Sequence, residues 1–170
     1  MGDSYVELMV KRKTNLTAMI FRNIFIGLGA MCVLLMVIAG GLLPVFLLGA
    51  ALMFILAYFC QQRIYIEYEY LYLDKTFSVD KITNKSKRKK IAEYSLENME
   101  VLAPIGSHHL DSYDNRPGMK GLDFSSRQPD ANLYIMIVKN GSTLYKLMIE
   151  CNDDLYNQIR QIAPRKVFSD

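Results

Sequence analysis

The chain has 170 residues, of which 51% are hydrophobic, and its formal net charge is +3 at pH 7. This length accommodates one domain of ordinary size and a short additional element, and it leaves no room for a second large domain. The small net charge excludes a strongly basic nucleic-acid-binding protein, so we expect no nucleic acid among the partners.

A run of 37 residues from Ile24 to Cys60 contains no charged residue and no Ser, Thr, Asn or Gln. One membrane-spanning helix needs about 20 apolar residues, so the run is long enough for two. Its centre, Gly40-Gly41-Leu42-Leu43-Pro44, favours a break in the helix. The run predicts a two-helix transmembrane hairpin over residues 17–61, with spans at about 17–39 and 42–61.

Basic residues flank the predicted hairpin on both sides, and its turn carries no charge. Positively charged flanks stay in the cytoplasm. We therefore expect residues 1–16 to be a cytoplasmic N-terminal segment, both termini to be cytoplasmic, and Gly41 to lie outside. The expected location is the cell membrane, crossed twice. The run is much longer than the 7 to 15 apolar residues, roughly, of a signal peptide, so we expect it to be retained.

After the hairpin, apolar and polar residues alternate with the period of β-strands. Strands are predicted at about residues 64–73, 77–82, 89–96, 99–103, 133–139 and 143–150, with a brief edge strand at 122–124. Asn140-Gly141, between the last two runs, is a strong hairpin signal. Residues 104–130 are rich in Gly, Pro, Ser and Asp, which predicts a long loop that is functional or mobile.

A C-terminal helix is predicted to begin after Asn152, a favourable N-cap, and to end before Pro164. Leu155, Ile159 and Ile162 form one apolar stripe that needs a sheet to cover. Six or seven antiparallel strands closed by this helix predict an α+β domain, a partly open barrel or sandwich of the PH-like type.

The stretches Glu67–Tyr70, Asp80–Ile82 and Pro164–Val167, with a basic turn at Asn84–Lys90, carry a resemblance that covers nearly the whole chain. They are similar to a family of small bacterial two-span membrane proteins with a cytoplasmic PH-like domain. The resemblance implies a transmembrane hairpin followed by a cytoplasmic PH-like domain at residues 62–170. It supplies no catalytic residues.

A cluster of basic residues follows the predicted membrane segment within about twenty residues. Its members are Lys85, Lys87, Arg88, Lys89 and Lys90. Such clusters attract anionic lipids by about 1 kcal/mol per cation, and PH domains that bind phosphoinositides do so near a basic strand turn. We expect loose contact with anionic headgroups. Specific headgroup recognition and a merely solvated turn remain open alternatives.

His108 and His109 lie in the long loop together with Asp111 and Asp114, and imidazole and carboxylate groups suit zinc. However, adjacent histidines cannot easily aim both rings at one ion, and the chain has no other histidine. We therefore expect mobile loop residues and no metal site. The three cysteines, Cys32, Cys60 and Cys151, form neither a disulfide framework nor a metal-binding spacing, which suits a reducing compartment.

The sequence contains no Gly-rich phosphate loop, no Gly-x-Ser-x-Gly and no His-Glu-x-x-His motif. It predicts a non-enzymatic protein without cofactor or catalytic residues: a membrane-tethered binding or scaffolding module. The expected partners are the lipid bilayer, anionic headgroups, and a membrane protein or a second copy of the chain. One alternative is an accessory or regulatory subunit of a membrane transporter or enzyme complex. A weaker alternative is an enzyme whose site forms from residues 104–130.

Overall fold

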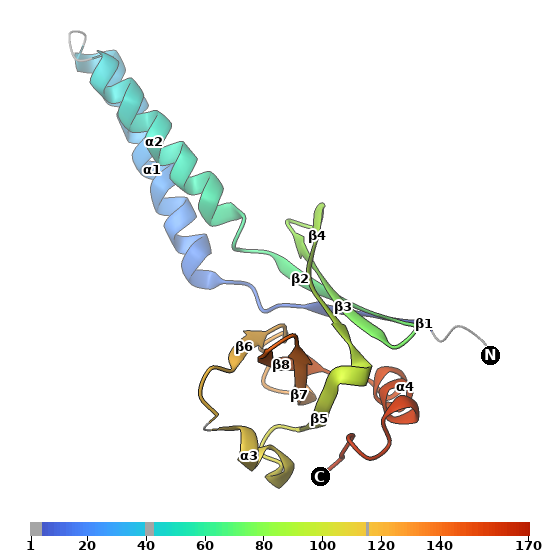
Figure 1. The fold of residues 1–170 in the computed structure, drawn as a ribbon. Coiled ribbons are helices and arrows are strands. Elements are labelled where there is room, and N and C mark those ends of the chain that lie inside the picture. Colours follow the sequence, from blue (N-terminus) through green and yellow to red (C-terminus); the bar gives the residue numbers. More distant parts are fainter. Residues whose placement is uncertain (1–4, 40–42, 115) are drawn as a thin grey trace. The chain divides into compact units, whose positions relative to one another are not determined.

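The computed structural model describes residues 5–39, 43–114 and 116–170 (Figure 1). The chain forms two compact units. The helical unit comprises residues 13–66 and 83–86. The sheet unit comprises the residues before 13 together with 67–82 and 87–170.

The helical unit consists of α1 (Leu16–Ala39) and α2 (Leu43–Gln61), which occupy the two predicted ranges. The predicted break at Gly40-Gly41-Leu42 lies outside the described residues. Both helices are long and apolar enough to cross a membrane, by length and composition. Within their most apolar windows only 6% and 11% of residues are buried.

Small residues let the two helices approach closely. A Cβ atom on Gly29 would lie 3.1 Å from the ring of Phe54, and one on Gly49 would lie 3.6 Å from Sγ of Cys32. Such close approach is how helices pack where the hydrophobic effect cannot drive their association. These glycines therefore serve packing within the hairpin.

The first sheet of the sheet unit has the order β1-β2-β3-β4. Its strands are β1 (Tyr5–Lys11), β2 (Ile66–Leu73), β3 (Thr76–Thr83) and β4 (Lys87–Ser95). Strand β1 runs antiparallel to β2, from Tyr5 opposite Leu73 to Lys11 opposite Glu67. Two-residue turns close both following hairpins, and each has positive φ at both central positions, as in type I′ turns. The turn residues are Asp74-Lys75 and Asn84-Lys85.

The second sheet has the order β5-β7-β8-β6. Its strands are β5 (Met99–Pro104), β6 (Lys120–Asp123), β7 (Leu133–Asn140) and β8 (Thr143–Glu150). β5–β7 and β7–β8 are antiparallel, whereas β6 pairs with β8 in parallel. The single turn η2 (Leu96–Asn98) joins the sheets. The expected loop at 104–130 contains η3 (His108–Leu110) and α3 (Asp111–Asp114) as well as β6.

Helix α4 (Asp153–Ile162) begins where the sequence predicts, because Oδ1 of Asn152 accepts a hydrogen bond from the Leu155 amide at 2.9 Å. Leu155 and Ile159 are fully buried. After α4, the chain returns to β5, where Val167 forms a parallel bridge with Leu102.

Tyr70 on β2 ties the two sheets together. Its hydroxyl donates to the Phe124 carbonyl at 2.9 Å and accepts from the Glu150 amide at 3.4 Å. Burial raises the pKa of Tyr70, so the phenol stays protonated and able to donate.

Two features differ from the sequence expectation. The described residues form eight strands in two sheets, one pair of them parallel, instead of six or seven antiparallel strands. Residues 5–11, expected to belong to a separate N-terminal segment at 1–16, form β1 on the edge of the first sheet. The domain expected at 62–170 therefore includes a strand from before the helices, and the hairpin is an insertion between β1 and β2.

Candidate functional site

The β3–β4 turn carries Lys85, the first residue of the predicted basic cluster. Within the helical unit, hydrogen bonds hold this turn at the end of α2. The Asn84 amide donates to the Tyr65 carbonyl at 3.1 Å, and Nε2 of Gln61 donates to Oδ1 of Asn84 at 3.1 Å. Lys85 is the neighbouring turn residue and is exposed. The turn thus holds Lys85 beside the segment that directly follows α2.

The helical unit carries only positive charge. Residues 13–66 and 83–86 contain four cations and no Asp or Glu: Lys13, Arg22, Arg63 and Lys85. These basal cations lie at the end of the hairpin where the chain enters α1 and leaves α2, since the Asn15 amide contacts the Ile64 carbonyl at 3.4 Å. Nη1 of Arg22 also donates to Oε1 of Gln61 at 2.8 Å. One end of the apolar hairpin therefore presents uncompensated positive charge.

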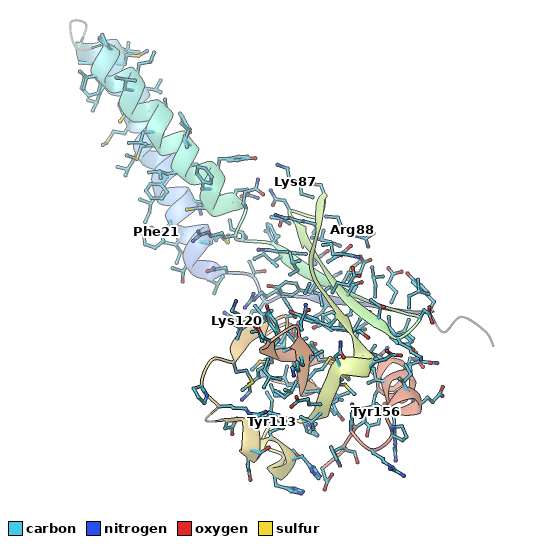
Figure 2. The ribbon with its side chains drawn as sticks, in the orientation of Figure 1. Phe21, Lys87, Arg88, Tyr113, Lys120 and Tyr156 are labelled. Carbon is cyan, nitrogen blue, oxygen red and sulfur yellow. The ribbon has the colours of Figure 1, made fainter. Side chains whose placement is uncertain are left out.

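The other predicted basic residues, Lys87 to Lys90, form the first half of the edge strand β4, and all four are exposed. Figure 2 labels Lys87 and Arg88 on this strand. The roles of the four residues differ. Lys90 forms an ion pair with Glu93 on the same strand. In the described part of the chain, Lys85 and Lys89 have no acidic partner within salt-bridge distance.

Arg88 crosses the first sheet to two carboxylates on neighbouring strands. It forms ion pairs with Glu69 on β2 and with Oδ2 of Asp80 on β3, the latter at 3.5 Å. Glu69 is only 1% exposed and Asp80 only 7%. Buried carboxylates are costly unless they are paired. Arg88 is therefore held in the fold by these two charges and is not available as an independent cation for a ligand.

A second charge cluster links Arg12, where the chain leaves β1 towards the helical hairpin, to the second sheet. Arg12, the residue after β1, donates through Nη2 to Oδ2 of Asp123 at 3.0 Å and through Nη1 to the Tyr68 hydroxyl at 2.7 Å. Ser125 and Arg127 also donate to Asp123. Burial, the largest single influence, raises the pKa of Asp123, but these hydrogen bonds and the charge of Arg12 outweigh it and leave the pKa lowered.

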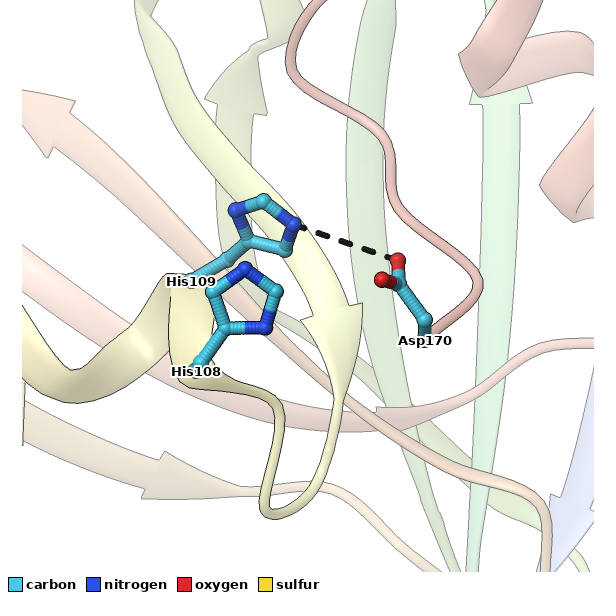
Figure 3. Close-up of side chains that lie close together, drawn as sticks. All are labelled: His108, His109 and Asp170. Carbon is cyan, nitrogen blue, oxygen red and sulfur yellow. Dashed lines mark ion pairs between the residues drawn. The ribbon is translucent and has the colours of Figure 1, made fainter.

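The structure separates the residues considered as metal ligands. Oδ1 of Asp114 accepts from Nζ of Lys146 at 2.7 Å, and Asp111 lines a pocket of about 210 Å³ together with both of these residues. Neither carboxylate joins the two histidines. Instead, His108 and His109 lie beside Asp170, near the end of the chain (Figure 3).

The three cysteines of the described chain lie in different surroundings and form no disulfide. Cys151 is buried, and desolvation raises the pKa of its thiol to about 12. Cys32 lies in α1 and Cys60 in α2, both partly buried.

Sequence reasoning missed β1, the Arg88 ion pairs and the association of the histidines with Asp170. Each depends on a partner far along the chain: β1 pairs with a strand more than fifty residues later. The alternation Val6, Leu8, Val10 was a usable signal for β1. No local pattern identifies the other two.

Two four-stranded sheets, closed by a C-terminal helix and interrupted after β1 by an apolar helical hairpin, define a PH-like domain protein with an inserted hairpin. A family described as bacterial PH-like domain (DUF6106) matches residues 2–169, and the chain belongs to this family. The match includes the hairpin as well as both sheets. No curated protein and no solved structure matches the chain.

Proposed function

We propose that this protein is a two-span membrane protein whose PH-like domain acts as a cytoplasmic binding or scaffolding module at an anionic membrane surface. The observation that carries the proposal is the exposed apolar surface of α1 and α2. Large side chains such as Leu34, Val37 and Leu48 are more than half exposed. Side chains project outward along both helices (Figure 2). Contiguous apolar surface of this kind is covered in use, by lipid or by protein.

The lengths of the helices suit a bilayer. At about 1.5 Å per residue, α1 with 24 residues and α2 with 19 residues are close to the roughly 30 Å of the hydrocarbon core. The basal cations supply the asymmetry that sets orientation. Because positive flanks remain in the cytoplasm, their end of the hairpin faces the cytoplasm, and the sheet unit and both termini lie on the same side.

On the helical unit, we assign the contact with anionic headgroups to the basal cations, which include Lys85. On the sheet unit, we assign it to the exposed residues Lys87 and Lys89 of the predicted cluster; Lys90, also exposed, forms an ion pair with Glu93. Each cation near an anionic leaflet contributes about 1 kcal/mol. Since two spans already anchor the chain, this energy would orient the domain and select anionic lipid. The proposal is non-enzymatic, as PH-like domains typically act by binding.

A specific observation favours the accessory-subunit alternative as the second candidate. Gly27 is exposed, and a Cβ atom placed on it would meet nothing within 4 Å. A small residue on the outer face of α1 permits close approach of a helix from another chain. A stoichiometric membrane protein that co-purifies in mild detergent would favour this role over the binding module.

Orientation is tested by cysteine labelling in intact cells. Single cysteines at Asp3, Gly41 and Asp170, in a cysteine-free background, are treated with an impermeant thiol reagent. Labelling at Gly41 alone is expected. Labelling at Asp3 and Asp170 without Gly41 would reverse the orientation.

Headgroup contact is tested on the full-length protein by native mass spectrometry, which counts phosphatidylglycerol and phosphatidylcholine molecules retained from mixed micelles. The wild type should retain the anionic lipid preferentially. The variant Lys85→Gln/Lys87→Gln/Lys89→Gln should lose part of this preference, because the basal cations Lys13, Arg22 and Arg63 remain. The control Lys75→Gln/Lys120→Gln/Lys139→Gln removes the same charge elsewhere on the exposed surface and should keep it. Equal loss in both triple variants would show that net charge alone is responsible.

A further inference from the structure

The C-terminal tail and the loop after β5 converge on the same strand. The Leu102 amide donates to the Lys166 carbonyl at 2.8 Å, and the Phe168 amide donates to the Leu102 carbonyl at 2.9 Å. β5 itself leads through Pro104 into η3, where the Ser107 hydroxyl accepts from the His109 amide at 3.3 Å. The tail is thus fixed to β5 by backbone hydrogen bonds, and η3 follows directly from the same strand.

Three potential metal ligands meet where these segments converge. One ligand atom from each of His108, His109 and Asp170 lies within 4.8 Å of the other two (Figure 3). The His108 and His109 ring centroids are 3.9 Å apart, and the ring of His109 stacks on Phe168 at 3.5 Å with an interplanar angle of 16°. The stacking fixes the His109 ring on the tail that also carries Asp170.

We propose that His108, His109 and Asp170 form a binding site for a divalent transition-metal ion, with Zn²⁺ as the best fit. Two imidazoles and one carboxylate are zinc ligands, and three protein ligands leave a coordination position for water or an external ligand. The bound ion fastens the C-terminal tail to η3.

The separation of His109 and Asp170 leaves room for an ion between the two side chains. Nε2 of His109 and Oδ1 of Asp170 are 3.9 Å apart, which is too long for a hydrogen bond. Ligand atoms about 2.0–2.2 Å from a tetrahedral zinc ion lie roughly 3.3 Å from each other. Asp170 is exposed, so a small side-chain rotation closes the difference.

The two histidine rings lie close together although the residues are adjacent in sequence. In an extended strand neighbouring side chains point to opposite faces, but His108 and His109 open the 3₁₀ turn η3. There the two rings lie side by side with an interplanar angle of 37°. The third ligand comes from Asp170 and not from the nearby Asp111 or Asp114.

The test measures Zn²⁺ bound to full-length, tag-free protein in detergent, after treatment with chelator, by equilibrium dialysis and elemental mass spectrometry. One ion per chain is expected. His108→Ala and Asp170→Asn, both at exposed positions, should each weaken binding at least tenfold. Asp111→Asn, an exposed carboxylate close by in sequence, is the matched control and should bind as the wild type does.

Two further readouts separate this site from the cysteines and from loose surface binding. Co²⁺ in place of Zn²⁺ should give ligand-field absorption without a thiolate charge-transfer band. Zn²⁺ should slow hydrogen exchange at residues 107–110 and 166–170 in the wild type and not in Asp170→Asn. Absence of stoichiometric binding, or wild-type affinity in Asp170→Asn, would overturn the proposal.

Discussion

Arg88 balances two buried carboxylates, Glu69 and Asp80, which would otherwise stand uncompensated. Replacing Arg88 by Gln should therefore destabilise the protein. Removal of one partner from a fully buried pair costs about 3–5 kcal/mol, and this is an upper limit because the Arg88 side chain is 53% exposed. Urea unfolding of the protein in mild detergent, followed by circular dichroism, measures the change.

Lys89→Gln, one residue along the same strand, is the control and should change stability by less than about 0.5 kcal/mol. Adding Glu69→Gln and Asp80→Asn to Arg88→Gln should recover part of the loss. If Arg88→Gln is as stable as Lys89→Gln, the ion pairs contribute nothing to the stability of the fold, and Arg88 is free to contact an anionic ligand.

Asp123 makes the stability of the sheet unit depend on pH. Its pKa is lowered from the ordinary value of 3.8. A lowered folded-state pKa contributes stability that is present above pH 4, approximately, and is lost as pH falls through the folded-state value. Asp123→Asn should lower the free energy of unfolding by about 1.5–3 kcal/mol near neutral pH, the range for a hydrogen bond to a charged group.

The difference in the free energy of unfolding between the wild type and Asp123→Asn should stay constant from about pH 5 to 7. It should become smaller below about pH 4. Unfolding curves at a series of pH values measure it. Asp130→Asn, at an exposed loop position, should show no such narrowing. A constant difference in the free energy of unfolding down to pH 2 would mean that the negative charge of Asp123 does not contribute to stability.

At the scale of single elements, α4 closes the sheet unit through Leu155 and Ile159, both fully buried. Ile159→Asp should unfold or severely destabilise the protein, because an unpaired charge would be buried beneath the helix. Gln158→Asp, on the neighbouring, partly exposed position, is the matched control and should be tolerated. Circular dichroism during heating distinguishes the two. Equal stability of both variants would contradict the packing of α4.

Elements with local signals were predictable from the sequence. The helices of the hairpin, the β7–β8 hairpin around Asn140-Gly141 and the N-cap of α4 at Asn152 form where neighbouring residues dictate. The PH-like domain as a class is confirmed by the family to which the chain belongs.

The remainder depended on contacts distant in sequence. The residues of β1 alternate between apolar and polar as in a strand, but the partner strand β2 follows the whole hairpin. No local pattern therefore indicates this pairing, and residues 5–11 were expected to belong to a separate N-terminal segment. The basic cluster could be recognised from the amino-acid sequence. The ion pairs of Arg88 with Glu69 and Asp80 could not, because they depend on how the strands align in the sheet. Only the folded chain brings Asp170 to the histidines.

At the scale of the whole molecule, the hairpin interrupts a sheet instead of preceding a domain. The sheet unit is therefore formed from both sides of the apolar insertion, and any version of it that begins after α2 lacks its edge strand. Each cross-strand pair contributes about 0.2–1 kcal/mol, and the β1–β2 register contains seven pairs. The Arg12 clamp to Asp123 is lost in the same truncation.

We therefore expect the sheet unit to fold alone when residues 13–65 are replaced by Asn-Gly. Lys11 pairs with Glu67, so Arg12 and Ile66 are the next opposed positions, and a two-residue type I′ turn closes an antiparallel hairpin there. The resulting protein keeps β1, Arg12 and both sheets and omits the exposed apolar helices. It should be soluble without detergent, rich in strand by circular dichroism, and should unfold cooperatively in urea.

The matched comparison is residues 66–170 alone, which should be less stable by several kcal/mol or aggregate through the exposed edge of β2, because unpaired edge strands recruit other chains. The joined protein that carries Arg12→Gln should have a stability between those of the joined protein and of residues 66–170 alone. If residues 66–170 alone are as stable as the joined protein, β1 is dispensable and the hairpin is an N-terminal appendage. If the joined protein is disordered while the full-length protein is folded, the sheet unit requires the helices for its stability and the two units are not independent.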